Sequence, residues 1–118
     1  MFKVIIAGTR TLEDYELVKQ YADYKLSKIT EQIEIVSGGA DGADALGERY
    51  ARERGYSIKV FPAEWEKYGR SAGPRRNKQM AEYADALLAY WDGKSRGTKN
   101  MIDEARKGQL KIGIKMYS

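Results

Sequence analysis

Short apolar runs alternate with helical patterns along nearly the whole chain, and this alternation limits the choice of fold more than any other feature. The apolar runs are rich in β-branched residues and close on Gly, Pro or Asp, as buried strands do. They lie at 3–8, 33–39, 57–63, 85–91 and 110–117.

Helices are predicted between these strands because apolar residues recur there at spacings of three and four. Pro74 fits the first position of the third helix, and Gly108 fits the end of the fourth. Each parallel crossover brings a helix back over the sheet, so the pattern predicts a mainly parallel sheet covered on both faces. The predicted helices cover 13–29, 41–55, 74–84 and 98–108.

Composition narrows the chemistry. The chain has no cysteine and no histidine, which removes the thiolate nucleophile, the commonest general base and the usual zinc ligands. We expect no metal and no cofactor, so that any chemistry comes from Asp, Glu, Lys, Arg, Tyr, Ser, Thr or the backbone. The net charge of +4 suits an anionic ligand.

Length and hydropathy set the outer limits. With 118 residues the chain has the size of one domain, which we expect to span 1–118. No apolar stretch approaches about 18 residues, so we expect no membrane association and a cytoplasmic location.

The loops that follow the predicted strands carry the functional signal. In a parallel α/β sheet the ligand lies outside the carboxyl ends of the strands. These loops combine glycine with hydroxyl or basic residues, whereas the connections at the opposite end are plain. The loops are 8–11, 37–44, 62–77 and 91–98.

The loop at 37–44 is glycine-rich but matches neither a Walker A loop nor a dinucleotide GxGxxG motif. It opens a helix, whose positive N-terminus favours an anion. In the plain interpretation Asp41 is the N-cap and Asp44 a first-turn carboxylate. In the alternative, Asp44 accepts a hydrogen bond from a ribose hydroxyl.

The last loop is the better anion cradle, because basic residues accompany its glycines and hydroxyls. We favour a binding function for it over a simple turn. Asn77 falls on the apolar stripe of the third helix, so it either reaches a ligand or holds a neighbouring loop. The residues of the cradle are Gly93, Lys94, Ser95, Arg96, Gly97 and Thr98.

Two tryptophans lie at or after strand ends. Trp65 is the best candidate for stacking on a nucleobase, but we favour packing of its loop onto the sheet over stacking. Trp91 is expected to finish its strand in the core.

Four segments together resemble one family: AGTRTLED, SGGADGADALGERYA, FPAEWEKYGRSAGPRRNKQM and ADALLAYWDGKSRGTKNMI. They are similar to the SLOG superfamily, which contains DprA/Smf and LONELY GUY proteins, and most of all to its small YspA-like branch of bacteria and phages. The resemblance implies a Rossmann-like three-layer α/β sandwich with a five-stranded, mainly parallel sheet of order 3-2-1-4-5. It also implies self-association into a homo-oligomer.

In this superfamily the glycine loops bind nucleotides or nucleotide-derived ligands. To the residues implied by the resemblance we add Trp65 from the stacking argument. The predicted ligand-binding residues are Gly8, Thr9, Arg10, Ser37, Gly38, Gly39, Asp41, Gly42, Asp44, Trp65, Arg76, Asn77, Asp92, Gly93, Ser95, Gly97 and Thr98.

The positions at which this sequence differs from the family motifs indicate which of three candidate functions to prefer. Met101 stands where the LONELY GUY phosphoribohydrolases keep a catalytic glutamate, so an N-glycosidase would have to use Asp92 or Asp44 instead. Asp41 replaces an arginine of the DprA loop and puts negative charge where a nucleic-acid backbone would lie. We therefore expect binding, for sensing or sequestering, of a nucleotide-like small molecule containing phosphate. The first alternative is an N-glycosidase that acts on such a ligand. The second alternative is DprA-like binding of single-stranded nucleic acid.

Overall fold

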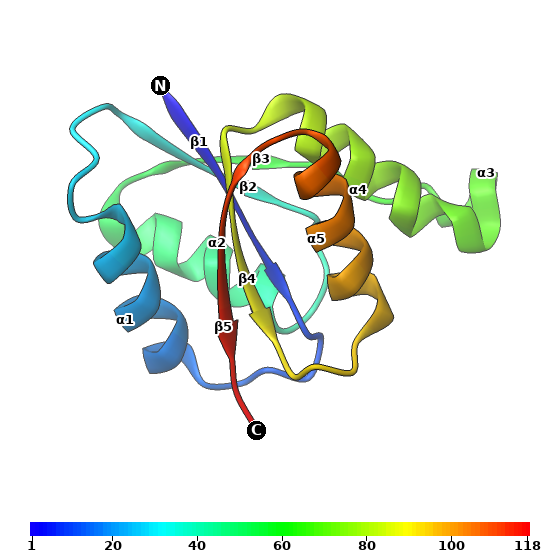
Figure 1. Ribbon diagram of the computed structural model, residues 1–118, viewed down its shortest axis with the longest axis horizontal. Coiled ribbons are helices and arrows are strands. Elements are labelled where there is room, and N and C mark those ends of the chain that lie inside the picture. The colour runs from blue at the N-terminus through cyan, green and yellow to red at the C-terminus, as the bar shows by residue number, and fades with distance from the viewer.

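The computed structural model describes residues 1–118 and contains one five-stranded parallel sheet of order β3-β2-β1-β4-β5 (Figure 1). The predicted Rossmann-like α/β fold and strand order are confirmed. At the centre of the sheet Ile5 pairs with Val36 on one side and with Leu87 on the other. The strands are β1 Phe2–Gly8, β2 Ile33–Ser37, β3 Ser57–Val60, β4 Ala86–Trp91 and β5 Lys111–Met116.

Strand β1 supplies both layers of the core because successive side chains point to opposite faces of a sheet. Val4 and Ile6 pack into one buried cluster, whereas Ile5 and Ala7 pack into the other. Val4, Ile5 and Ile6 are fully buried, and each contributes about 1.5–3 kcal/mol to the stability of the fold.

Helices α1 (Tyr15–Leu26) and α2 (Ala43–Arg54) cover the face of the sheet that carries Val4 and Ile6 (Figure 1). Helices α4 (Ala72–Tyr83) and α5 (Arg96–Lys107) cover the other face. Each helix packs against the sheet through the face on which its apolar side chains recur. The result is the predicted three-layer arrangement.

Capping groups set the helix starts. Asp14 caps α1 by accepting a hydrogen bond from the Leu17 amide at 3.1 Å. Ser95 caps α5, which therefore begins two residues before the predicted position 98. Helix α4 also begins two residues early, and Pro74 is its third residue, still in the first turn where an amide hydrogen has no helical partner.

The prediction that Asp41 caps α2 is wrong. Gly42 occupies the N-cap with a φ of 71°, a conformation that a side chain would strain, and no side chain caps the helix. Gly42 also lies so close to the first loop that a Cβ would come within 2.4 Å of the Thr9 and Arg10 carbonyl oxygens. Asp41 is left exposed.

Part of the segment predicted as a loop after β3 is helical. It forms the short helix α3 (Trp65–Tyr68) and a 3-10 turn, η1 (Gly69–Ser71), that runs into α4. None of the side chains of α3 and η1 is buried. Figure 1 shows α3 standing away from the sheet as an arm.

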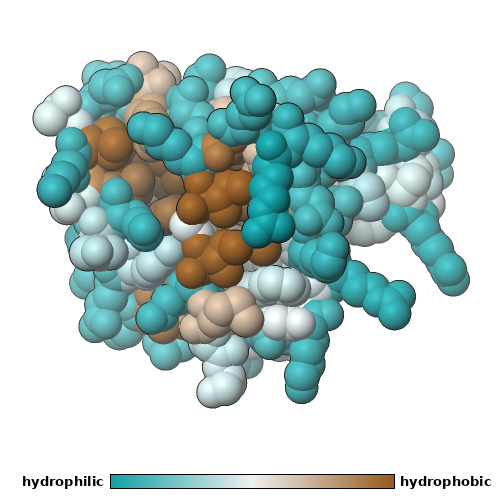
Figure 2. Space-filling view, viewed as in Figure 1, coloured by the Kyte–Doolittle hydropathy of each residue, from teal (hydrophilic) through white to brown (hydrophobic).

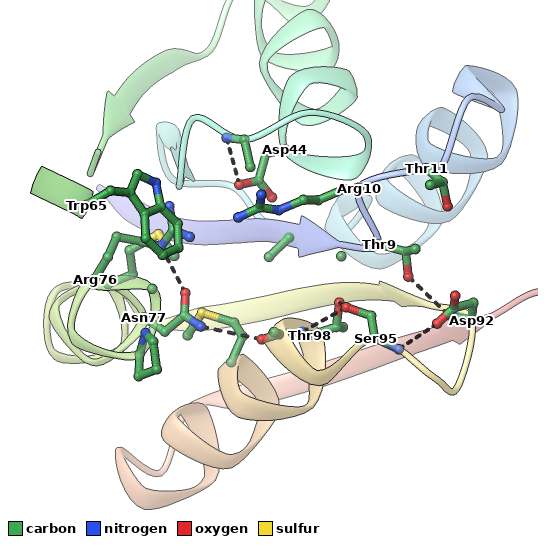
Figure 3. A pocket seen from close by; sticks show the side chains of 18 residues that line it. Thr9, Arg10, Thr11, Asp44, Trp65, Arg76, Asn77, Asp92, Ser95 and Thr98 are labelled. Carbon is green, nitrogen blue, oxygen red and sulfur yellow. Dashed lines mark hydrogen bonds between the residues drawn. The ribbon is translucent and has the colours of Figure 1, made fainter. Parts of the chain in front are cut away.

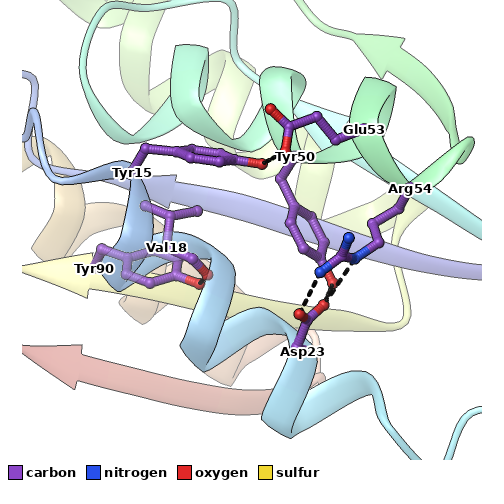
Figure 4. Close-up of polar contacts among 7 residues, drawn as sticks. All are labelled: Tyr15, Val18, Asp23, Tyr50, Glu53, Arg54 and Tyr90. Atoms are coloured by element: carbon purple, nitrogen blue, oxygen red, sulfur yellow. Dashed lines mark hydrogen bonds and ion pairs between the residues drawn. The ribbon is translucent and has the colours of Figure 1, made fainter.

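A set of hydrogen-bonded charges and tyrosines joins α1 to α2, which we name the α1–α2 cluster (Figure 4). The Tyr50 hydroxyl donates to Asp23 at 2.6 Å, and Arg54 donates to both oxygens of the same carboxylate. Tyr15 donates to Glu53 at 2.9 Å.

The end of the sheet opposite the predicted site carries an apolar groove. Beside the edge strand β5, at the amino ends of the strands, lies a groove of about 250 Å³ lined mostly by hydrophobic side chains. Figure 2 shows brown hydrophobic residues gathered on this face of the molecule among teal hydrophilic ones. None of the helices is both long and apolar enough to cross a bilayer.

Candidate functional site

A cavity of about 450 Å³ opens where β1 and β4 end, between the first turns of α2, α4 and α5 (Figure 3). A smaller cavity of about 260 Å³ adjoins it toward the end of β3. We call them the large and the small cavity. Both are lined by Arg10, Ala40, Trp65 and Arg76.

Most of the predicted ligand-binding residues line one of the two cavities. Gly38, Gly39 and Asp41 line only the small one. Ser37, Gly42 and Gly93 line neither. Ser37 is fully buried and donates to Glu48 at 2.7 Å, which gives it a role inside the protein. The predicted residues on the large cavity are Gly8, Thr9, Arg10, Asp44, Trp65, Arg76, Asn77, Asp92, Ser95, Gly97 and Thr98.

Arg76 is the central cation of the site. It is only 8% exposed, yet it lines both cavities. Its Nη1 donates to the Gly38 carbonyl and its Nε to Asn77 Oδ1 at 3.0 Å, while Nη2 has no partner in the protein. Burial lowers the pKa of Arg76, although the nearby Asp44 opposes this. A buried guanidinium with unused donors is a binding group for an oxyanion.

Asp44 lies beside Arg76 as the second residue of α2, as the first-turn interpretation predicts. It is 6% exposed, and Oδ2 accepts a hydrogen bond from the Ala40 amide at 3.2 Å. Burial raises the pKa of Asp44 to about 6, against the opposing effects of the Ala40 bond and of Arg76. Asp44 therefore keeps its proton to a higher pH than an ordinary aspartate does.

Gly38 keeps these two groups together. A Cβ at this position would lie 2.5 Å from Arg76 Nη1 and 2.7 Å from Asp44 Oδ2. Any side chain there would displace one of them, so this glycine is required for close approach.

The first turn of α5 is largely satisfied by its own side chains. Ser95 Oγ accepts from the Thr98 amide at 3.3 Å, and Asp92 accepts from the Lys94 and Ser95 amides at 2.8 and 2.9 Å. These amides lower the pKa of Asp92. Asp92 is thus fixed as a turn-forming carboxylate, and the Gly97 amide is left for an outside acceptor at the cavity wall. Lys94 and Arg96 line neither cavity.

Asn77 holds two helices together. Its Nδ2 donates to Asn100 Oδ1 at 2.9 Å, and its Oδ1 accepts from Arg76. The prediction that this amide needs a partner on the apolar stripe is confirmed. The bond from Arg76 Nε also orients the Arg76 guanidinium toward the cavities.

Trp65 is 49% exposed and its ring borders both cavities. The ring lies against Gly73 of α4, so packing of its loop onto the sheet is the wrong interpretation. The Arg10 guanidinium carbon is 5.8 Å from the ring centroid. Trp91 packs against the core, as predicted, and donates to the Ser95 carbonyl at 3.0 Å.

Sequence reasoning missed several apolar wall residues. Pro62 and Ala63 line the small cavity, and Met80 lines the large one. Pro62 and Ala63 follow shortly after β3, and Met80 lies on the apolar stripe of α4. These positions in the sequence could have indicated that the residues line the site. Met101 also lines the large cavity and is 1% exposed.

Comparisons with known proteins agree with this architecture. Gene 61 protein of Mycobacterium phage D29 is 33% identical over an alignment of 118 positions, which covers 95% of this chain and 94% of that protein. The crystal structure of DNA processing protein A (DprA) from Streptococcus pneumoniae superposes with a TM-score of 0.74 at 14% identity, over 97% of this chain. This chain spans 50% of that DprA chain, and the likeness concerns the fold.

A predicted tRNA methyltransferase subunit from Methanocaldococcus jannaschii superposes less well, with a TM-score of 0.47 at 12% identity, over 97% of this chain and 67% of that one. The model of the YspA, cpYpsA-related SLOG family matches residues 2–68, which include β1, α1, β2, α2 and β3. The chain therefore belongs to the YspA, cpYpsA-related SLOG family.

Proposed function

We propose that this protein binds a nucleotide or a nucleotide-derived small molecule through its phosphate, as a sensor or a sequestering protein. The observation that carries the proposal is Arg76, whose buried guanidinium has unused donors beside a cavity of about 450 Å³. A cavity of that size falls within the common range for small-molecule sites.

The surrounding groups support the same ligand class. Arg10 has no ion pair and adds a second positive charge beside Arg76. Trp65 offers a half-exposed aromatic face for a base. Asp44 lines the same cavity, and its ionised carboxylate would accept a hydrogen bond from a ribose hydroxyl.

Calorimetry with AMP, GMP, CMP and UMP tests the proposal. Arg76→Ala is expected to weaken binding by about 1.5–3 kcal/mol, because it removes a charge-assisted contact. The matched control is Arg75→Ala, since Arg75 is exposed, stacks on Tyr68 and lines neither cavity. Arg10→Ala provides a second variant, in which an exposed side chain is removed.

Unchanged affinity in both Arg76→Ala and Arg10→Ala would contradict the proposal. Tight binding of a single-stranded oligonucleotide, with no detectable binding of any mononucleotide, would favour the nucleic-acid function instead. A steep salt dependence, with a slope of about −0.7 per neutralised phosphate, is its signature.

One observation favours N-glycosidic cleavage as a second candidate. Asp44 is a buried carboxyl group whose pKa of about 6 suits proton transfer near neutral pH. Asp92 suits this role less, because two backbone amides donate to its Oδ1 and lower its pKa. Chromatography of AMP after a single-turnover incubation tests it: base release that Asp44→Asn abolishes would establish catalysis.

The protein is expected to release little or no base, because Met101 stands where the related hydrolases keep glutamate. Met101 is 1% exposed, so Met101→Glu places a carboxyl group in an apolar cluster. Once circular dichroism has shown that this variant folds, a gain of base release in it would reveal a latent N-glycosidase site.

A further inference from the structure

The second cavity beyond Arg10 and Trp65 gives the site a two-part shape. The large and small cavities have volumes of about 450 and 260 Å³, and both arginines line both of them. The positive charge therefore lies at the junction, and each side of the junction offers separate room for an uncharged group.

The two sides differ in chemistry. The large cavity has a wall of hydroxyl and amide groups, the carboxyl groups of Asp44 and Asp92, and the apolar side chains of Met80 and Met101. The small cavity is bounded by Pro62, Ala63 and the glycine loop, and its one carboxylate is that of Asp41. Asp41 makes no hydrogen bond or ion pair within the protein. A free carboxylate beside a small apolar wall suits a group that presents hydroxyls.

Arg76 supplies the independent sign that a ligand belongs at the junction. It is more than nine-tenths buried, and its Nη2 remains without a partner although the guanidinium is held by two bonds from Nη1 and Nε. Arg10 faces the same place, with its guanidinium near the Trp65 ring (Figure 3). Two guanidinium groups at one boundary match a diphosphate better than a single phosphate.

We propose that the ligand is a nucleoside diphosphate joined to a sugar, with the nucleoside in the large cavity, the diphosphate at Arg10 and Arg76, and the sugar against Asp41 in the small cavity. This inference rests on the proposed function and specifies its ligand class. The smaller volume of the second cavity fits a sugar rather than a second nucleoside.

Calorimetry with AMP, ADP and ADP-glucose, and with UMP, UDP and UDP-glucose, tests the inference. In the series whose base is accepted, the diphosphate sugar is expected to bind about tenfold or more tightly than the diphosphate alone. Asp41→Ala and Ala63→Phe should each remove this gain, measured against the diphosphate alone in the same variant, because both residues line only the small cavity. Ala45→Phe is the matched control, since Ala45 is exposed and lines neither cavity.

The possible failures are distinct. If the monophosphates and diphosphates bind but the sugar adds no affinity, or if its gain survives both variants, the two-part ligand is wrong and the proposed function stands. If no member of either series binds, and GMP and CMP do not bind either, both are wrong. Asp41→Ala changes an exposed side chain, so the test does not depend on whether Ala63→Phe folds.

Discussion

The two ends of helix α2 carry polar clusters that are built differently. At its N-terminus, Asp44 and the neighbouring Arg76 are buried beside open cavities and keep hydrogen-bonding capacity unused. Toward its C-terminus, in the α1–α2 cluster, Tyr50 and Arg54 share the Asp23 carboxylate and are satisfied within the protein.

The difference separates binding from stability. A buried charge that lacks hydrogen-bond partners destabilises the free protein. A ligand that supplies the missing partners offsets this cost on binding. A cluster whose groups are already paired contributes to the fold and offers nothing to a ligand. Substitutions at the two ends of α2 should therefore change different properties.

The largest expected effect is that of Asp44→Asn on stability above neutral pH. The folded-state pKa of Asp44, about 6, lies above its ordinary value of about 4, so the protonated form is favoured by folding. Its contribution is fully present below pH 4 and is lost as the pH rises through 6. This corresponds to about 3 kcal/mol at pH 8, which Asp44→Asn should recover while its amide oxygen still accepts from Ala40.

Urea denaturation at pH 4, 6 and 8 measures this effect. The variant and the natural protein should be equally stable at pH 4 and diverge as the pH rises. Parallel pH profiles would show that Asp44 is not a strained buried carboxylate, and the contrast between the two clusters would lose its basis.

Asp23→Ala tests the other end of α2 and should destabilise the protein by about 2 kcal/mol, because it leaves the hydroxyl of Tyr50, a residue that is 1% exposed, without its acceptor. Nucleotide affinity should not change. Adding Tyr50→Phe should recover most of the loss, since both partners are then apolar. A loss of affinity in Asp23→Ala would mean that the two clusters are coupled through the helix.

Trp65→Ala is expected to weaken nucleotide binding by about 1–2 kcal/mol through loss of stacking. Its effect on stability should be small, because the ring is half exposed and lies on the arm rather than in the core. Calorimetry and urea denaturation of the same variant measure both properties. Tyr24→Ala, which removes a more exposed ring on α1, is the control and should change neither.

The smallest effect is expected for Glu53→Gln in the α1–α2 cluster. Glu53 is at the exposed edge of the cluster, and an amide oxygen can replace its carboxylate as the acceptor of the Tyr15 hydroxyl. No measurable change in the urea midpoint is expected. A clear destabilisation would show that the charge of Glu53, and not its hydrogen bond, holds the two helices together.

The sequence determined the fold through local patterns. The alternation of apolar runs and helical stripes is a short-range property, and a right-handed crossover after each strand leaves few ways to arrange such elements. For the same reason the sequence could place loops 8–11, 37–44, 62–77 and 91–98 at one edge of the sheet, and the cavities lie there.

Only the tertiary structure decided what each polar residue at that edge does. The sequence predicted Asp41 as the N-cap of α2 and Asp44 in its first turn, but Gly42 is the N-cap, and Asp41 is exposed whereas Asp44 is buried. Asp92 satisfies its own turn, whereas Arg76 reaches from α4 to the Gly38 carbonyl and keeps donors unused. Burial and hydrogen-bond partners depend on neighbours far away in the chain, and they set both pKa and availability to a ligand, so no local pattern could have distinguished these residues.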